Sequence, residues 1–124
     1  DFMLERYKNY KVFSNKLPIR EKGKIVLLNQ DDIVYCESQG KKVLICTRDG
    51  TGYMSNYTLN ELEGRLDHTS FFRAHQAFIV NLNHIKEIVN FGEGSYILHL
   101  NNCNKNIILS RSRAKQLRQK MSIQ

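Results

Sequence analysis

The sequence predicts a mostly β domain with minor α+β character: short antiparallel sheets in a β-sandwich-like stack, one short interior helix and a C-terminal helix. Short runs rich in β-branched and aromatic residues alternate with Gly, Asn and Asp turn residues between positions 16 and 109. Helical periodicity is confined to residues 58–66 and 110–121. A chain of 124 residues has the size of one domain. We assign residues 1–14 to a linker remnant or short helix and residues 15–124 to the domain.

The first half of the domain is predicted to consist of hairpins. Gly23 separates two short apolar runs that follow Pro18, which excludes a helix there. Residues 33–57 predict a three-stranded meander whose first turn lies at residues 39–42. Its second turn, Asp49-Gly50, favours the type I′ geometry, which requires positive φ.

A short helix and, after residues 71–85, three further strands follow. Thr58-Leu59-Asn60-Glu61 is a capping-box pattern, and the leucines at 59, 62 and 66 form one face that is expected to cover a sheet. Residues 92–95 predict a hairpin turn between strands at residues 85–91 and 96–100, and the alternation of Tyr96, Leu98 and Leu100 predicts that the second strand buries one face. Residues 105–109 predict the third strand. Ser110 or Ser112 then caps the last helix, whose apolar side holds Ala114, Leu117 and Met121.

The domain is organised around residues 71–85, where the pattern of apolar residues fits neither a regular helix nor a regular strand. Phe71 and Phe78 are expected to be buried anchors, with Arg73, His75 and Gln76 between them. Polar groups that a scaffold already holds lose little entropy on meeting a ligand. We therefore expect a pre-organised contact loop here.

Charge is unevenly distributed along the chain. The 19 basic and 12 acidic residues give a net charge of +7. Residues 101–124 hold six basic and no acidic residues, and residues 1–24 hold seven and three, whereas the middle holds six and nine. Basic ends on a mildly acidic body are suited to polyanion binding. A solvated basic tail is the alternative interpretation.

The sequence lacks the signatures of an enzyme or a metal site. There is no GxSxG, HExxH or phosphate-binding glycine loop, and the four histidines lack metal-ligand spacing. Cys36, Cys46 and Cys103 form no CxxC pair and are expected to be small core residues in a reducing compartment. With neither a secretion leader nor an apolar run of about 20 residues, we expect a cytoplasmic protein without membrane contact, cofactor or catalytic residues.

Several segments together resemble the LytTR DNA-binding domain. The resemblance rests on residues 71–81 (FFRAHQAFIVN), on Ile85, on residues 109–113 (LSRSR), on residues 31–38 and on the helix pattern of residues 59–66. It covers about residues 17–121. The family is the output half of bacterial response regulators, so it implies a phospho-receiver domain and a cognate sensor kinase as partners. It also implies loops entering the major groove of double-stranded DNA at direct-repeat sites.

The family resemblance implies three contact regions: the 38–43 loop, the residues after Arg73 and the start of the last helix. Gln76 stands where many members carry a shorter polar residue, and the 38–43 loop lacks the histidine of some members, which leaves base or phosphate contact open there. An arginine fork matches guanine and a glutamine amide matches adenine, so Arg111 and Gln76 are predicted to read bases and Lys115 to contact phosphate. The candidate DNA-binding residues are Gln39, Lys41, Lys42, Arg73, His75, Gln76, Lys105, Arg111, Ser112, Arg113 and Lys115.

Two other functions remain open at this level. A small β scaffold can bind RNA or single strands by stacking bases on exposed aromatics. Tyr35, Tyr53 and Tyr96 alternate with apolar residues and are expected to be half-buried, which argues against that mode. A protein-interaction domain is the third hypothesis, although it would not need the segregated charge. Without a coiled-coil pattern, the isolated domain is expected to be a monomer.

Overall fold

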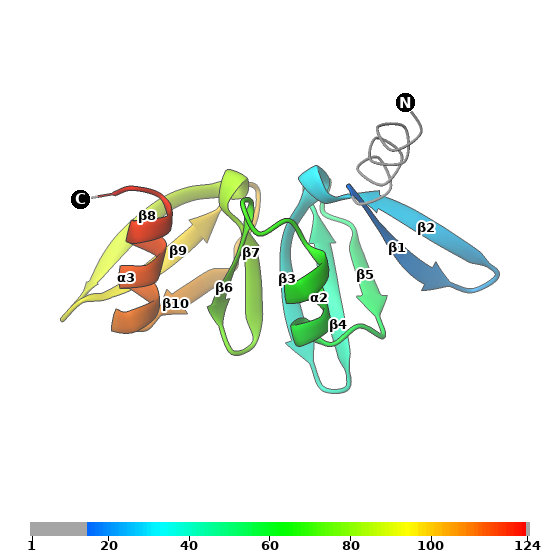
Figure 1. Cartoon of the computed structure of the whole chain (residues 1–124), viewed down its shortest axis with the longest axis horizontal. Coiled ribbons are helices and arrows are strands. Elements are labelled where there is room, and N and C mark those ends of the chain that lie inside the picture. Colours follow the sequence, from blue (N-terminus) through cyan, green and yellow to red (C-terminus); the bar gives the residue numbers. More distant parts are fainter. Residues whose placement is uncertain (1–14, 124) are drawn as a thin grey trace, which may run out of the picture.

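The structure, a computed structural model, describes residues 15–123 as three antiparallel sheets arranged along the long axis (Figure 1). A two-stranded hairpin lies at one end, a five-stranded sheet in the middle and a three-stranded sheet at the other end. The linker or helix predicted for residues 1–14 lies outside the described residues. The mostly β class is confirmed.

The strands of the three sheets have the following bounds. The end hairpin is β1 (Lys16–Glu21) and β2 (Lys24–Asn29). The central sheet has the order β5-β4-β3-β7-β6, formed by β3 (Ile33–Gln39), β4 (Lys42–Thr47), β5 (Gly52–Ser55), β6 (Phe71–His75) and β7 (Phe78–Asn81). The three-stranded sheet has the order β10-β9-β8, formed by β8 (Ile85–Gly92), β9 (Ser95–Leu100) and β10 (Asn106–Leu109).

The central sheet buries both faces, each in its own apolar cluster. One cluster joins this sheet to the β1–β2 hairpin and helix α2 (Leu59–Arg65). The other joins it to the three-stranded sheet and helix α3 (Arg111–Lys120). Adjacent residues such as Phe71 and Phe72 therefore belong to different clusters, as the side-chain alternation of a strand requires. The expected stack of layers has the five-stranded sheet at its centre.

Both helices begin as predicted. Thr58 and Glu61 form the capping box of α2, whose leucines at 59, 62 and 66 are buried. Ser110, and not Ser112, caps α3 by accepting a hydrogen bond from the Arg113 backbone N–H. Ala114 and Leu117 are buried, but the prediction for Met121 is wrong, because this residue follows the last helical turn and is exposed.

Two turns differ from the expected geometry. In the loop after β4 only Gly50 has positive φ, and the Asp49 carboxylate instead accepts hydrogen bonds from Thr47 Oγ1 at 2.5 Å and Thr51 N at 3.0 Å. The type I′ prediction for Asp49-Gly50 is therefore wrong, although the hairpin itself is confirmed. Positive φ at both central residues, the mark of type I′, occurs instead at Glu93-Gly94 between β8 and β9.

Residues 71–85 are more regular than expected. They form the β6–β7 hairpin, with a bulge between Arg73 and His75, then the 3-10 helix η2 (Leu82–His84) and the start of β8. The contact loop of the prediction is thus reduced to the turn Gln76-Ala77. Phe71 is buried as predicted, whereas Phe78 is only half-buried.

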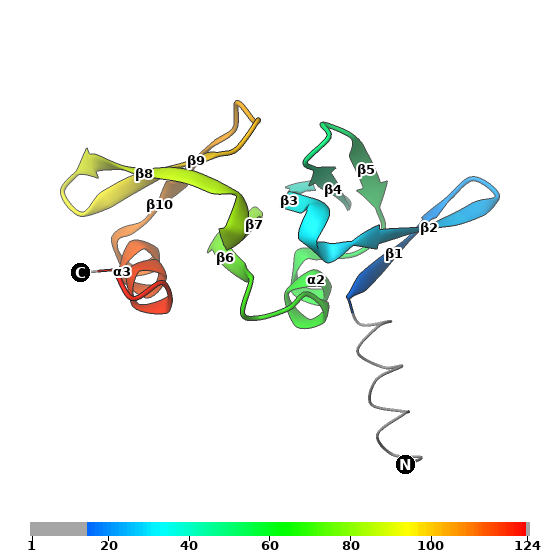
Figure 2. The ribbon, with the colours of Figure 1, turned by 90° about the horizontal axis from the view of Figure 1, so that it is seen from above.

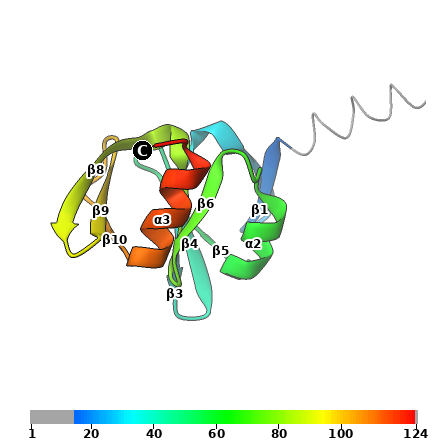
Figure 3. The same cartoon turned by 60° about the vertical axis from the view of Figure 1, so that its left-hand side comes forward.

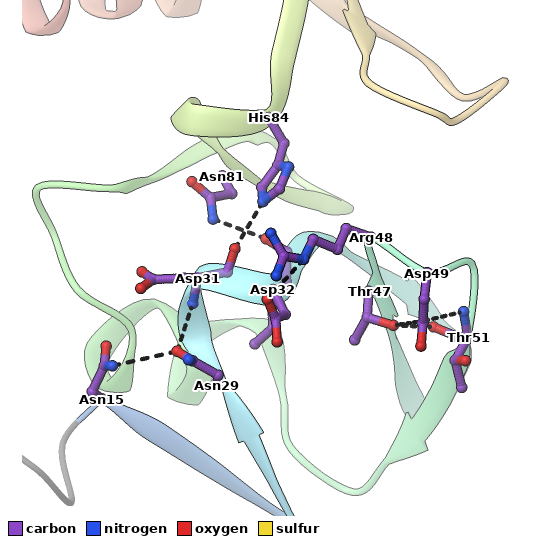
Figure 4. Close-up of polar contacts among 11 residues, drawn as sticks. Asn15, Asn29, Asp31, Asp32, Thr47, Arg48, Asp49, Thr51, Asn81 and His84 are labelled. Atoms are coloured by element: carbon purple, nitrogen blue, oxygen red, sulfur yellow. Dashed lines mark hydrogen bonds and ion pairs between the residues drawn. The ribbon is translucent and has the colours of Figure 1, made fainter.

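Hydrogen bonds join the two halves of the chain at the edge opposite this turn. There η2 lies against the 3-10 helix η1 (Gln30–Asp32), which connects β2 to β3. His84 Nε2 donates to the Asp31 carbonyl at 2.8 Å, and buried Asn81 Nδ2 donates to the Ile33 carbonyl at 2.9 Å (Figure 4). Arg48 also pairs with Asp32 at 2.9 Å. These bonds fix the connectors, so the turns at the opposite edge extend from a braced sheet.

Candidate nucleic-acid interface

Three predicted contact segments lie along one edge of the molecule, the lower edge in Figures 1 and 3. They are the β3–β4 turn (residues 39–42), the β6–β7 turn (residues 75–77) and the beginning of α3 (residues 110–115). We call this set the contact edge. The backbone N–H of Ser38, which precedes the first segment on β3, donates to the Ala77 carbonyl of the second segment at 2.9 Å. Segments that are far apart in the sequence thus lie along one edge of the folded chain.

The β3–β4 turn presents unpaired side chains. Gln39 and Lys42 are paired across the strands, so the loop is only Gly40-Lys41. Gly40 has a φ of 64°, and Lys41 has negative φ, the sign pattern of a type II′ turn. Gln39, Lys41 and Lys42 are exposed, and none makes a side-chain bond to the rest of residues 15–123. Their amide and ammonium groups are free to meet a ligand.

The β6–β7 turn is held by Arg73. Its Nε donates to the His75 carbonyl at 3.0 Å, and its Nη2 donates to the Gln76 carbonyl at 2.6 Å. Its Nη1 donates to Asn60 Oδ1 and to Glu63 Oε1 of α2, both at 3.0 Å. Four of the five guanidinium N–H groups are therefore used inside the protein, and only 14% of the side chain is exposed. This geometry does not support the predicted direct contact of Arg73 with DNA.

His75 and Gln76 point outward from this braced turn. His75 Nδ1 accepts a hydrogen bond from Ala77 N at 3.0 Å, so the proton of the neutral ring is on Nε2. The imidazole also packs edge-on against Phe78, with 6.0 Å between ring centroids. Both residues are exposed, and the Gln76 side-chain amide has no partner among residues 15–123. Two outward donors, His75 Nε2–H and the Gln76 amide, therefore lie on a fixed backbone.

Lys105 is already engaged by groups of the central sheet. Its Nζ is 3.2 Å from the Glu37 carboxylate and 6.0 Å from the centre of the Phe78 ring. The predicted DNA contact would require this half-buried ion pair to open. Lys105 instead connects the β9–β10 loop to the strands that carry the contact edge.

The beginning of α3 supplies a second set of cations. Arg111 Nε donates to the Glu93 carbonyl at 2.6 Å, which ties the helix to the β8–β9 turn. A Cβ on Gly94 would lie 2.8 Å from Arg111 Cγ, so the glycine allows this close approach. Both Nη groups of Arg111 are left without a partner among residues 15–123. A cation at a helix N-terminus is disfavoured by the helix dipole, and the Glu93 carbonyl oxygen provides Arg111 with a compensating acceptor there.

The remaining candidate residues of α3 differ in whether their side chains already have partners inside the protein. Arg113 Nη1 donates to Gln116 Oε1 at 3.3 Å, and the Ser112 hydroxyl is 3.3 Å from that of Ser110. Lys115 is exposed, without a partner among the described residues. Further along the helix, Arg118 lies over the Tyr96 ring at 5.9 Å. The basic side chains of α3 that remain available to a ligand are therefore concentrated toward the beginning of the helix.

The thiols behind the contact edge are protected. Cys36 is fully buried, while Cys46 and Cys103 are half-buried, and all three are unbonded to one another. Burial raises the pKa of the Cys36 and Cys46 thiols, which disfavours the reactive thiolate. Within residues 15–123, no three His, Cys, Asp or Glu side chains are grouped as a metal site would require. No helix in that range is long and apolar enough to cross a membrane.

Sequence reasoning missed the residues that hold the contact edge. Asn60 and Glu63 on α2 orient Arg73, and the Glu93-Gly94 turn orients Arg111. Asn60 and Glu63 look like ordinary exposed helix residues in the sequence. Their role in orienting Arg73 depends on the packing of α2 next to β6, so no local sequence pattern could have predicted it.

Comparisons with known proteins identify the family of the chain. The family model described as the LytTr DNA-binding domain matches residues 23–122. The sensory transduction protein LytT of Bacillus cereus is 40% identical over 107 residues, which are 86% of this chain and 42% of that protein. The transcriptional regulatory protein YpdB of Escherichia coli K12 is 34% identical over 100 residues, 81% of this chain and 41% of that protein. This chain thus spans about two fifths of the length of these relatives.

A solved structure supports the same relationship. The LytTr DNA-binding domain of a putative methyl-accepting/DNA response regulator from Bacillus cereus superposes with a TM-score of 0.76 at 26% sequence identity. The match covers 88% of this chain and 98% of that one. The resemblance seen in the sequence is confirmed: the chain belongs to the LytTr DNA-binding domain family.

Proposed function

We propose that the chain binds double-stranded DNA sequence-specifically through the contact edge, and that it does so as the output domain of a response regulator. The observation that carries this proposal is the common edge of three segments that are distant in sequence. That edge exposes amide and cationic groups that have no partner among residues 15–123, and a hydrogen bond from Ser38 to Ala77 joins the strand before the β3–β4 turn to the β6–β7 turn. Turns and a helix end are elements that can enter the major groove, which is about 12 Å wide.

The roles of the residues follow from how tightly each is held. Arg111 and Gln76 read base edges, because the Glu93 carbonyl holds the Arg111 side chain and Arg73 holds the Gln76 backbone carbonyl. His75 Nε2–H adds a donor beside Gln76. Lys41, Lys42 and Lys115 have long unpaired side chains and contact phosphate, with Gln39, Ser112 and Arg113 as polar neighbours. Arg73 and Lys105 act indirectly, by positioning the turns that make the contacts.

Burial of the tyrosines favours duplex DNA over single strands. Tyr35 is buried, and Tyr53 and Tyr96 are half-buried, so the sheets offer no open row of aromatic rings for stacked bases. We infer that a phospho-receiver domain accompanies this domain in the full-length protein, that a cognate sensor kinase acts through the receiver, and that the protein works in the cytoplasm. Neither a catalytic group nor a cofactor is needed for this role.

The test compares Arg111→Ala with Lys115→Ala on a selected duplex and on a scrambled one, at two salt concentrations. A duplex selected from a random library supplies the specific site. We expect Arg111→Ala to cost about 1–3 kcal/mol on the specific duplex and little on the scrambled one. Lys115→Ala should weaken both equally and lower the salt slope by about one.

Equal losses on both duplexes would make Arg111 a phosphate clamp and move the specificity elsewhere. Wild-type binding that is insensitive to salt between about 50 and 200 mM would contradict polyanion recognition itself, since several released counterions predict a change on the order of 10³-fold. Binding to the separated strands in preference to the duplex would favour the single-strand function instead.

A further inference from the structure

The β8–β9 turn brings one acidic side chain to the beginning of α3. The turn consists of Glu93 and Gly94, since Gly92 and Ser95 are the last residues paired across the two strands. Figures 1 and 2 show the β8–β9 hairpin beside α3 at the same end of the molecule. The 2.6 Å bond from Arg111 Nε to the Glu93 carbonyl joins the turn to the helix. Glu93 is therefore the neighbour of an arginine on the contact edge.

The backbone at Glu93 is unfavourable for a glutamate. Its φ is 52°, in the left-handed region that favours Gly, Asn and Asp over other residues. The first central position of a type I′ turn is accordingly most often one of these three. Because asparagine would fit this turn better than glutamate, the stability of the hairpin does not explain the residue. Strained positions of this kind cluster at functional sites.

The Glu93 carboxylate is not neutralised by a neighbouring cation. It is exposed, and it has no ion-pair partner in the part of the chain that the structure describes. Two acids behind the neighbouring turns differ in this respect. Glu37 pairs with Lys105 at 3.2 Å, and Glu63 pairs with Arg73 at 3.0 Å. The β8–β9 turn thus places an uncompensated negative charge beside a contact edge whose three segments contain no acidic residue.

This charge acts differently on the two kinds of DNA group that Arg111 could contact. A phosphate on the Arg111 Nη groups would lie within roughly one Debye length (8 Å at physiological salt) of the Glu93 carboxylate, so screening would not remove their repulsion. A guanine edge presents O6 and N7 without a net charge and is repelled much less. The carboxylate therefore disfavours phosphate and tolerates a base at the same arginine.

Resting on the proposed DNA binding, we propose that Glu93 is a specificity-determining residue, whose carboxylate keeps phosphate away from Arg111 and so restricts this arginine to base edges. The effect is greatest on random DNA, where no guanine is placed for Arg111 and a phosphate contact would otherwise form. Lys41 and Lys42, whose turn contains no acidic residue, remain phosphate contacts. Glu93 thus widens the difference in affinity between the right and the wrong sequence by penalising the wrong one.

The experiment compares Glu93→Gln with wild type on the selected and the scrambled duplex, at two salt concentrations. Glutamine removes the charge and keeps the shape, and the carbonyl that holds Arg111 belongs to the backbone and is retained. Glu21→Gln removes an exposed acid on the distant β1–β2 hairpin and is the matched control for net charge. A further variant combines Glu93→Gln with Arg111→Ala.

We expect Glu93→Gln to bind the scrambled duplex about 3- to 5-fold more tightly, with a salt slope raised by about one, because Arg111 then reaches a phosphate. Affinity for the selected duplex should change by less than about 2-fold, since Arg111 already contacts a base there. The gain on scrambled DNA should disappear when Arg111→Ala is added. Glu21→Gln should affect both duplexes alike.

Glu93→Asn separates the charge from the backbone conformation. Asparagine tolerates positive φ, so the melting temperature should rise by about 2–4 °C, while binding to the scrambled duplex should rise as it does in Glu93→Gln. A more stable but less specific variant would show that the glutamate serves recognition. A fall in melting temperature would show that it serves the hairpin, against the argument from the backbone.

Unchanged binding of Glu93→Gln to the scrambled duplex would overturn the exclusion of phosphate. A loss of affinity for the selected duplex alone would also contradict it, because Glu93 would then read a base itself, as a carboxylate does by accepting from cytosine N4. The same gain in Glu21→Gln would reduce the effect to net charge. Each of these results leaves the DNA-binding proposal intact, whereas that proposal fails if wild type does not prefer the selected duplex.

Discussion

The β3–β4 and β6–β7 turns lie side by side on the contact edge but are held in different ways. The β3–β4 turn contains Gly40 with positive φ, and its side chains have no partner in the part of the chain that the structure describes. Neither Gln76 nor Ala77 of the β6–β7 turn has positive φ, so this turn lacks the primed geometry that fits strand twist. Side-chain hydrogen bonds stabilise this turn instead. Arg73 donates to the His75 and Gln76 carbonyls, and His75 Nδ1 accepts from the Ala77 N–H.

The difference assigns different tasks to two adjacent loops. A turn whose geometry comes from its own glycine can present flexible lysines, which suit phosphate oxygens at variable positions. A turn fixed by side chains of β6 and α2 holds its outward groups in one place, as base recognition requires. Rigidity, more than residue type, separates the proposed base reader from the proposed phosphate binder.

The largest expected effect is on stability, and it concerns the two phenylalanines of the β6–β7 hairpin. Phe71→Ala removes a buried ring from the α2 cluster and should lower the free energy of unfolding by about 3–5 kcal/mol. Phe78→Ala should cost clearly less, because this ring is half-buried and yields less apolar area. Urea unfolding of both variants measures the difference. A Phe78 variant as unstable as the Phe71 variant would show that the turn contributes to the core.

The second prediction concerns Arg73, whose hydrogen bonds hold the β6–β7 turn. Arg73→Ala leaves two turn carbonyls and Glu63 without their donor, and should destabilise the domain by roughly 1–3 kcal/mol. Specific binding should fall about tenfold, with the salt slope unchanged, because no phosphate contact is lost. Arg73→Lys should fail to restore it, since an ammonium cannot reproduce the fork. A lower salt slope in Arg73→Ala would make Arg73 a direct phosphate contact.

The smallest effects compare one side chain from each turn. Gln76→Ala should cost about 1–3 kcal/mol on the selected duplex and almost nothing on a scrambled one. Lys41→Ala should weaken both duplexes alike and lower the salt slope by about one. Titrations at two salt concentrations distinguish the two patterns. If the patterns are exchanged, the rigid turn contacts phosphate and the glycine turn reads the bases.

Much of the fold could be predicted because its signals are local. Gly23 and Gly40, the capping box at Thr58 and the alternation of residues 96–100 each specify a turn, a helix start or a buried strand face within a few residues. The type I′ turn was placed at Asp49-Gly50 because composition alone favours Asp-Gly. The Asp49 carboxylate instead bonds Thr47 and Thr51, a local alternative that competes with the primed turn.

The sequence by itself determined the class of fold, the family and the segments that form the contact edge. It could not determine which cations on that edge are free, because an ion pair or a hydrogen bond depends on residues far away in the chain. Arg73 meets Glu63 of α2, Lys105 meets Glu37 of β3, and Arg111 meets the Glu93 carbonyl only after the sheets have packed. Tertiary structure therefore decided which basic residues remain available to DNA, since a donor already used inside the protein is no longer offered to a ligand.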